Sequence, residues 1–260
     1  MSHETMPMES MVGPLCRELR LPSVARDAAR LAREAQRQGR DHLSFLVQLF
    51  EIEVHDRRER RSLRRTREAR FPIAKTLESF DFSRAPQMPE ARLRKLTDGE
   101  YIDRAEAVIL VGEPGTGKTH LATALGMAAA QQGRRVRFVT AGRLVNELIE
   151  ARDALDLSRV IGRFSRYEVL ILDELGYLPL SRTDADLLFQ VLSERQELRS
   201  TIVTTNLPFG EWTSVFPDPR LCRAVIDRLT FNAHIIETGT TSVRLAEALK
   251  RQETNSKLED

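Results

Sequence analysis

The sequence predicts an α/β protein: a five-stranded parallel sheet lies between helices and follows a small all-α region. Two observations lead to this fold class. After about position 100, short aliphatic runs alternate with amphipathic helical patterns, as expected for parallel strands buried on both faces. Before Pro72 the periodicity is helical. With 260 residues, 41% of them hydrophobic and 30% charged, the chain can hold one full α/β domain and a smaller helical one.

Two helices are expected in the N-terminal region. The first begins at Ser23, its expected N-cap, and ends near Gly39. The second begins near Asp41 or Ser44 and stops before Pro72, since the residue that precedes a proline is pushed out of the helical conformation. Together they form a small helical domain.

The domain boundaries follow from where the patterns change. We expect a helical domain over residues 1–72 that binds DNA or a partner, a proline-broken linker over 73–90, an ATPase domain over 91–248 and a flexible tail over 249–260. Five aliphatic runs are the expected strands: residues 107–111, 136–140, 169–172, 201–204 and 234–237.

The cysteines and the apolar stretches of the sequence indicate the cellular compartment in which the protein is expected. Cys16 and Cys222 lie far apart and outside any Cys/His cluster, so neither a disulfide framework nor a zinc site is expected. No apolar stretch approaches the length of a membrane span, and the first residues are too polar for a signal peptide. We therefore expect a cytoplasmic protein.

Basic residues concentrate before position 76. Residues 1–75 hold 16 Lys and Arg against 11 Asp and Glu, and the segment 57–70 alone holds eight arginines against two glutamates. Such a segment suits salt-sensitive contact with DNA phosphates that does not depend on base sequence. A solvated helix face is the alternative. The arginines expected to contact DNA are Arg57, Arg58, Arg60, Arg61, Arg64, Arg65 and Arg67.

One segment matches a phosphate-binding loop at every fixed position. It follows an apolar strand and opens an Ala/Leu-rich helix, so backbone N–H groups and the helix N-terminus are expected to bind the phosphates of ATP. Lys118 is expected to reach the β- and γ-phosphates, and Thr119 to hold Mg²⁺. The residues expected at the nucleotide are Gly112, Glu113, Pro114, Gly115, Thr116, Gly117, Lys118, Thr119 and His120.

Polar residues end two further strands. Asp173 and Glu174 follow an aliphatic run, and alternation along the strand turns them in different directions. We expect Asp173 to hold Mg²⁺ and Glu174 to polarise the attacking water, which predicts hydrolysis of ATP and not binding alone. Asn206 ends the next strand and borders the same crevice, where it can orient the water.

These elements, in this order, resemble the AAA+ class of P-loop ATPases. Further segments narrow the resemblance to the IstB and DnaC group, and most closely to the IstB-like transposition helper proteins. They are residues 75–82, 112–122, 173–179, 205–209 with Trp212, 224–229 and 242–244.

The resemblance implies two arginine roles. Arg228 corresponds to the arginine finger that reaches a neighbouring subunit's nucleotide, and Arg244 to a sensor arginine near the γ-phosphate. The alternative for Arg228 is a surface arginine paired with Asp227. The segment 216–222 is richer in proline than the group's pattern, which bears on the placement of Arg228.

The resemblance also implies a function. The chain would be an ATP-hydrolysing helper of DNA transposition that assembles as an oligomer on duplex DNA and stimulates an IstA-like transposase. Two alternatives stay open. A DnaC-like helicase loader belongs to the same group, and a small-molecule kinase shares the phosphate loop but needs a substrate pocket and a clamping lid.

Overall fold

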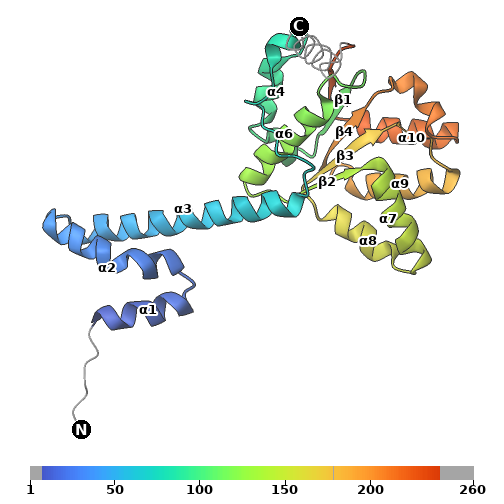
Figure 1. Cartoon of the computed structure of the whole chain (residues 1–260). Helices are drawn as coiled ribbons and strands as arrows, with labels where there is room; N and C mark the ends of the chain where they lie inside the picture. The colour runs from blue at the N-terminus through green and yellow to red at the C-terminus, as the bar shows by residue number, and fades with distance from the viewer. Residues whose placement is uncertain (1–7, 178, 241–260) are drawn as a thin grey trace, which may run out of the picture. The chain divides into compact units, whose positions relative to one another are not determined.

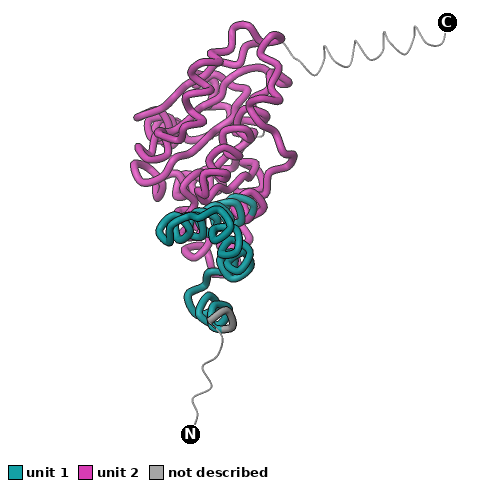
Figure 2. The backbone as a smooth tube through the Cα atoms, turned by 90° about the vertical axis from the view of Figure 1, so that its left-hand side faces the viewer, with its two compact units in different colours: residues 1–63 teal, residues 64–260 magenta. Residues whose placement is uncertain are grey.

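The computed structural model describes residues 8–177 and 179–240. The chain divides into two compact units, one within residues 1–63 and one within residues 64–260 (Figure 2). The boundary between the units lies inside one long helix, α3 (His42–Ala69). Within the described ranges, no helix is both long enough and apolar enough to cross a membrane. The domain limits expected from the sequence remain a prediction.

The first unit is helical. It contains α1 (Met8–Glu18), α2 (Pro22–Arg37) and the first part of α3. The α1 helix was not among the expected helices, and Pro14 lies inside it. The core of this unit is small and is made by a few buried side chains: Cys16, Val24, Leu31 and Leu49.

The expected N-cap of α2 is wrong. The helix begins at Pro22, whose fixed φ suits the first helical position, and Leu21 is the N-cap residue. The backbone N–H of Ser23 donates instead to Oε2 of Glu53 on α3, at 2.8 Å. A carboxylate distant in sequence therefore satisfies the first turn of α2.

The sheet of the second unit confirms the predicted parallel sheet. Its five strands are all parallel and run in the order β2-β3-β4-β1-β5 (Figure 1). The strands are β1 (Ala107–Val111), β2 (Val136–Thr140), β3 (Val169–Leu175), β4 (Ser200–Thr205) and β5 (Ala233–Glu237).

Helices cover both faces of the sheet (Figure 1). Ile109 of β1 packs into a cluster with the helices α7 to α10, whereas its neighbours Val108 and Leu110 pack on the other face with α4 and α6. This alternation is why every central strand is aliphatic on both sides. The helical elements are η1 (Phe82–Arg84), α4 (Glu90–Leu96), α5 (Glu100–Asp103), α6 (Lys118–Gln131), α7 (Ala141–Asp153), α8 (Leu157–Ser165), α9 (Arg182–Arg195), η2 (Phe209–Ser214) and α10 (Pro219–Thr230).

The proline-rich segment 216–222 starts a helix. Pro219 is the first residue of α10, and the carboxylate of Asp218 accepts the backbone N–H groups of Arg220 and Leu221. Pro219 therefore fits a helix start, and Arg228 lies in the last turn of α10.

Candidate nucleotide site

The loop between β1 and α6 has the backbone conformation that its glycines permit. Gly115 and Gly117 have φ angles of 86° and 96°, in the left-handed region. A Cβ atom on Gly117 would lie 2.6 Å from Cε2 of Phe80, a residue of the segment before η1. The aromatic ring thus packs directly against the loop, and the site leaves no room for a larger residue at this position.

The loop presents unused donors. Gly117 is the N-cap of α6, and no side chain caps this helix. Within the described residues, the backbone N–H groups of Gly115, Gly117 and Thr119 are bonded to no protein acceptor. Free N–H groups at a helix N-terminus bind anions, so the loop fits a phosphate chain.

Lys118 lies over the same loop. Its Nζ donates to the carbonyl oxygens of Gly112 and Glu113, at 2.5 and 2.8 Å. The ammonium group is therefore held at the mouth of the loop, where a phosphate oxygen can replace a carbonyl oxygen as its acceptor.

Three side chains from three elements meet beside the loop. The hydroxyl of Thr119 on α6 donates to both carboxylate oxygens of Asp173 on β3, at 3.0 and 3.2 Å. The hydroxyl of Thr204 on β4 donates to the same carboxylate at 2.6 Å. Asp173 is buried, with 4% of its surface exposed. Hydroxyl and carboxylate oxygens are the ligands that Mg²⁺ prefers, so Thr119 and Asp173 fit this ion.

Glu174 differs sharply from its neighbour. Its φ angle is 61°, and the pairing of β3 with β4 shifts register between Leu172 and Leu175. The Glu174 side chain is exposed, while its backbone N–H donates to Oγ1 of Thr204 at 2.9 Å. The two carboxylates do point to different environments, and a backbone irregularity adds to the strand alternation that we expected.

Asn206 follows β4, the strand between β3 and β1. The preceding residue, Thr205, lies in register with Leu175 and Val111. Asn206 is therefore at the sheet edge shared by the loop and by Asp173.

Sequence reasoning missed Thr204 and Thr238. Thr204 bonds Asp173 and Glu174 as described above. The hydroxyl of Thr238, just after β5, lies 2.6 Å from that of Thr116 in the loop, and both threonines are buried. A polar residue in a buried strand was the available signal for Thr204, but threonine is also an ordinary strand former.

His120 packs against residues 76–80, which lie between α3 and η1. Its Nε2 lies 2.9 Å from the carbonyl oxygen of Thr76 and 3.1 Å from the hydroxyl of Ser79, and its ring meets Phe80 edge-on at 5.1 Å. Burial lowers the pKa of His120 below its ordinary value. These contacts give His120 a packing role next to the loop.

Arg228 lies away from the loop. It is on α10, and it bonds Gln196 and Ser193 of the α9 region and not Asp227. Arg244, the expected sensor arginine, lies outside the described residues.

The arginines of α3 divide into two groups. Arg57 and Arg60 lie 3.0 and 3.5 Å from Oε1 of the buried Glu53, whereas Arg58 and Arg61 are exposed and have no ion-pair partner in the described part of the chain. In the second unit, Arg64 and Arg65 lie within 3.9 Å of Glu68, and Arg67 is exposed.

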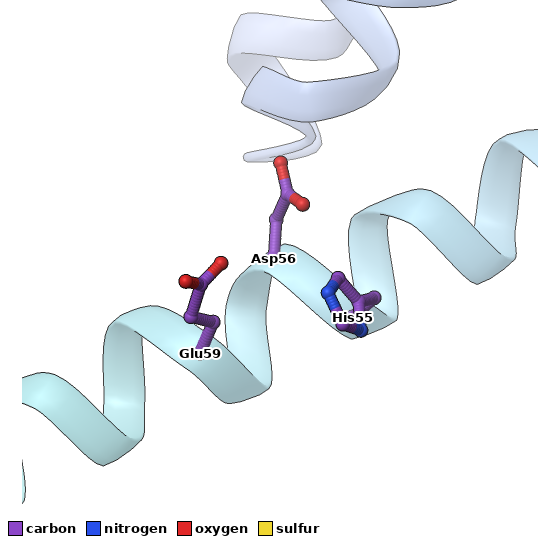
Figure 3. A group of neighbouring side chains, drawn as sticks. All are labelled: His55, Asp56 and Glu59. Carbon is purple, nitrogen blue, oxygen red and sulfur yellow. The ribbon is translucent and has the colours of Figure 1, made fainter.

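One group of side chains on α3 has the composition of a metal site. The ligand atoms of His55, Asp56 and Glu59 lie within 4.8 Å of one another (Figure 3). Asp56 is already paired with Arg26 at 2.9 Å. Asp56 therefore already belongs to a surface ion pair, and we assign no metal to this group.

The model of the IstB-like ATP binding protein family matches residues 15–251. A relative named for ATP binding in insertion sequence IS5376 of Geobacillus stearothermophilus is 35% identical over 246 residues, which are 95% of this chain and 98% of the relative. Its counterpart in insertion sequence IS21 of Pseudomonas aeruginosa is 37% identical over 236 residues, 91% and 89% of the two chains.

Solved structures share the α/β fold. The crystal structure of the DnaC helicase loader superposes with a TM-score of 0.55 at 24% identity, over 65% of this chain and 98% of that one. AMPPCP-bound DnaA from Aquifex aeolicus gives a TM-score of 0.56 at 19% identity, over 65% and 51%. At these identities the likeness shows the fold alone, and this fold is the predicted α/β class with a parallel sheet between helices.

Proposed function

The chain belongs to the family of IstB-like ATP binding proteins, and from this premise we propose that it is an ATP-hydrolysing helper of DNA transposition. In this proposal it assembles as an oligomer on duplex DNA and stimulates a transposase of the IstA kind. The relatives named for insertion sequences support the proposed role in transposition. The cluster around Asp173 supports the chemistry.

The observation that carries the hydrolytic part is the contrast between Asp173 and Glu174. Asp173 is buried and bonded to Thr119 and Thr204, so it is suited to hold Mg²⁺ together with Thr119. Glu174 is exposed at the end of the strand with its carboxylate unpaired by any ion pair in the described ranges. Glu174 directly follows Asp173, which contacts Thr119 at the end of the loop, and an exposed carboxylate at such a place can accept a proton from an attacking water.

The other residues complete the hypothesised mechanism. The loop N–H groups and Lys118 bind the phosphates, and Asn206 orients the water beside Glu174. Mg²⁺, when bound, neutralises charge on the phosphate oxygens. Arg228 of a neighbouring copy offsets the charge that develops in the transition state, and Arg244 senses the γ-phosphate.

Contact with duplex DNA is assigned to the arginines of α3 (Arg57 to Arg67). Arg58, Arg61 and Arg67 are exposed and available to phosphates, while the arginines near Glu53 and Glu68 must first exchange their partners. Such binding depends on charge and carries no base readout.

The two alternatives have weaker support. A helicase loader of the DnaC kind shares the fold, but the sequence relatives over most of this chain come from insertion sequences. A small-molecule kinase would protect its acceptor from water, whereas here the candidate general base, Glu174, is exposed.

The test is Glu174→Gln in the full chain with duplex DNA. The variant should bind ATP with unchanged affinity and hydrolyse it at least about a hundredfold more slowly, the range for loss of a general base. Fluorescent-nucleotide titration and phosphate release measure the two quantities. Wild-type turnover in this variant would remove Glu174 from the mechanism.

A further inference from the structure

Three side chains of the α9 region surround Arg228 of α10. We infer that Phe189, Ser193 and Gln196 are positioning residues: they hold the Arg228 guanidinium in place without neutralising it, so that it can meet a phosphate bound by a neighbouring copy. The inference rests on the proposed function, which assigns Arg228 as the finger.

The contacts fix the guanidinium on three sides. Nε of Arg228 donates to Oε1 of Gln196 at 2.8 Å, and Nη1 donates to Oγ of Ser193 at 2.7 Å. The guanidinium carbon lies 4.1 Å from the ring centroid of Phe189. Phe189, Ser193 and Gln196 are spaced by four and three residues, so they share one face of α9 and its C-cap. We call Phe189, Ser193 and Gln196 together the Arg228 cradle.

The hydroxyl of Ser193 is itself oriented. It donates to the carbonyl oxygen of Phe189 at 2.6 Å, which turns its lone pairs toward Arg228. The cradle is therefore built by α9 before any neighbour arrives.

All three contacts are neutral. Among the described residues, no carboxylate lies within ion-pair distance of Arg228, and the adjacent Asp227 does not bond it. The local Asp227–Arg228 pair, the alternative weighed from the sequence, is thus absent. A guanidinium held by an amide, a hydroxyl and an aromatic face keeps its full charge for an incoming anion.

Arg195 shows what a structural arginine looks like in the same place. It is 1% exposed and donates to the carbonyl oxygens of Phe164, Tyr167 and Ser200 at 2.7, 2.8 and 2.5 Å. Burial, and then the nearby Arg199, lower the pKa of Arg195 to about 9. Its donors serve the interior, whereas Nη2 of Arg228 is bonded to no acceptor among the described residues.

The location of Arg228 separates it from its own nucleotide site. It lines a cavity of about 270 Å³ together with Ala107, the first residue of β1, and Thr201 near the start of β4. The phosphate loop follows Val111, the last residue of β1. The cradle and the loop are thus at opposite ends of the same strand, which is why the inference places the phosphate that Arg228 meets on a second copy.

The test measures ATP turnover of full-length variants with duplex DNA. Gln196→Leu removes the acceptor of Nε at nearly constant volume, and kcat should fall about tenfold with KM for ATP unchanged, the order expected for one lost hydrogen bond to a charged group. Gln196→Glu should lower kcat further, since its carboxylate pairs with the guanidinium. Ser193→Ala, a deletion of one atom, should lower kcat severalfold.

Ser165→Ala is the matched control. Ser165 on α8 makes the same kind of bond to its own helix, to the carbonyl oxygen of Ile161 at 2.9 Å, and does not contact Arg228. It should keep the wild-type kcat. Equal losses in Ser165→Ala and Ser193→Ala would overturn the inference.

A mixing experiment separates positioning from general damage. Gln196→Leu subunits keep an intact nucleotide site, and Glu174→Gln subunits keep an intact cradle without turnover. The mixture should hydrolyse ATP faster than the sum of the two proteins alone, and no gain in mixed assemblies would overturn the inference.

The variant Arg228→Ala separates the positioning inference from the finger assignment on which it rests. If Arg228→Ala itself keeps wild-type turnover, the finger assignment fails. If only Arg228→Ala loses turnover and the Gln196 and Ser193 variants do not, the positioning inference alone fails.

Discussion

The phosphate site and the arginine-rich part of α3 are both rich in polar groups, but they are built differently. At the phosphate site, Thr119, Asp173 and Thr204 come from three elements and meet within 3.2 Å, with the carboxylate buried. On α3 the ion-paired arginines use glutamates on the same helix, as Arg57 does with Glu53, and the others are exposed. The first region fixes a geometry, as a reaction requires; the second offers charge, which suffices for a polyanion.

The largest expected effect is at the loop lysine. Lys118→Ala should weaken ATP binding at least about a hundredfold, because an ammonium–phosphate contact is worth about 3 kcal/mol and each 1.4 kcal/mol is a factor of ten. Titration with a fluorescent ATP analogue measures it. Lys75→Ala, an exposed lysine before the loop, is the control. Unchanged ATP affinity in Lys118→Ala would contradict the phosphate site.

The loop glycine comes next. Gly117→Ala forces a left-handed alanine whose Cβ would lie 2.6 Å from Phe80, so we expect a loss of about 2 kcal/mol in the free energy of unfolding and weaker ATP binding. Gly162→Ala on α8 meets nothing within 4 Å and should be neutral or slightly stabilising. Adding Phe80→Leu should recover part of the loss in Gly117→Ala. Chemical unfolding of the full chain checks these values, and equal behaviour of the two alanine variants would count against the packing described.

These two regions also mark what the sequence could and could not predict. The position of the loop between a strand and a helix was predictable because its glycines, lysine and threonine occur at a fixed spacing in the sequence. The position of Asp173 and Glu174 at the end of a strand was predictable because an aliphatic run precedes them. The partners of Thr204, Glu53 and Arg228 were not. Each depends on how one helix or strand packs against another that is distant in sequence, and no local pattern encodes that packing.

Glu53 of α3 accepts hydrogen bonds from the first turn of α2 and so holds the two helices in a fixed arrangement. It is 3% exposed, and burial raises the pKa of its carboxyl; the N–H groups of Ser23 and Val24 and the nearby Arg57 outweigh this, so the pKa lies below its ordinary value. Glu53→Ala should destabilise the first turn of α2 by about 1 to 2 kcal/mol. Because the folded-state pKa is lowered, the stabilisation is present above the ordinary pKa near 4.5 and is lost as pH falls through the folded-state value.

Hydrogen exchange of the α2 amides in the full chain measures this effect. Glu51→Ala, an exposed neighbour on α3, is the control. Wild-type protection in Glu53→Ala would show that Glu53 does not cap α2.

The smallest effects are expected for single arginines of α3. Arg58→Ala and Arg61→Ala should each reduce the salt dependence of duplex binding by about one unit of slope and lower affinity severalfold, uniformly across sequences. Arg57→Ala should change the slope less, since Arg57 is bonded to Glu53. Binding isotherms at several salt concentrations decide this, and a slope unchanged in all three variants would move the DNA contact away from α3.

The central claim is a nucleotide-controlled assembly on DNA. The most direct measurement is the mass of the full chain in solution by light scattering, with and without ATP, Mg²⁺ and duplex DNA. We expect an oligomer when ATP and DNA are both present, and we expect Lys118→Ala to lose it. A monomer under every condition would contradict it.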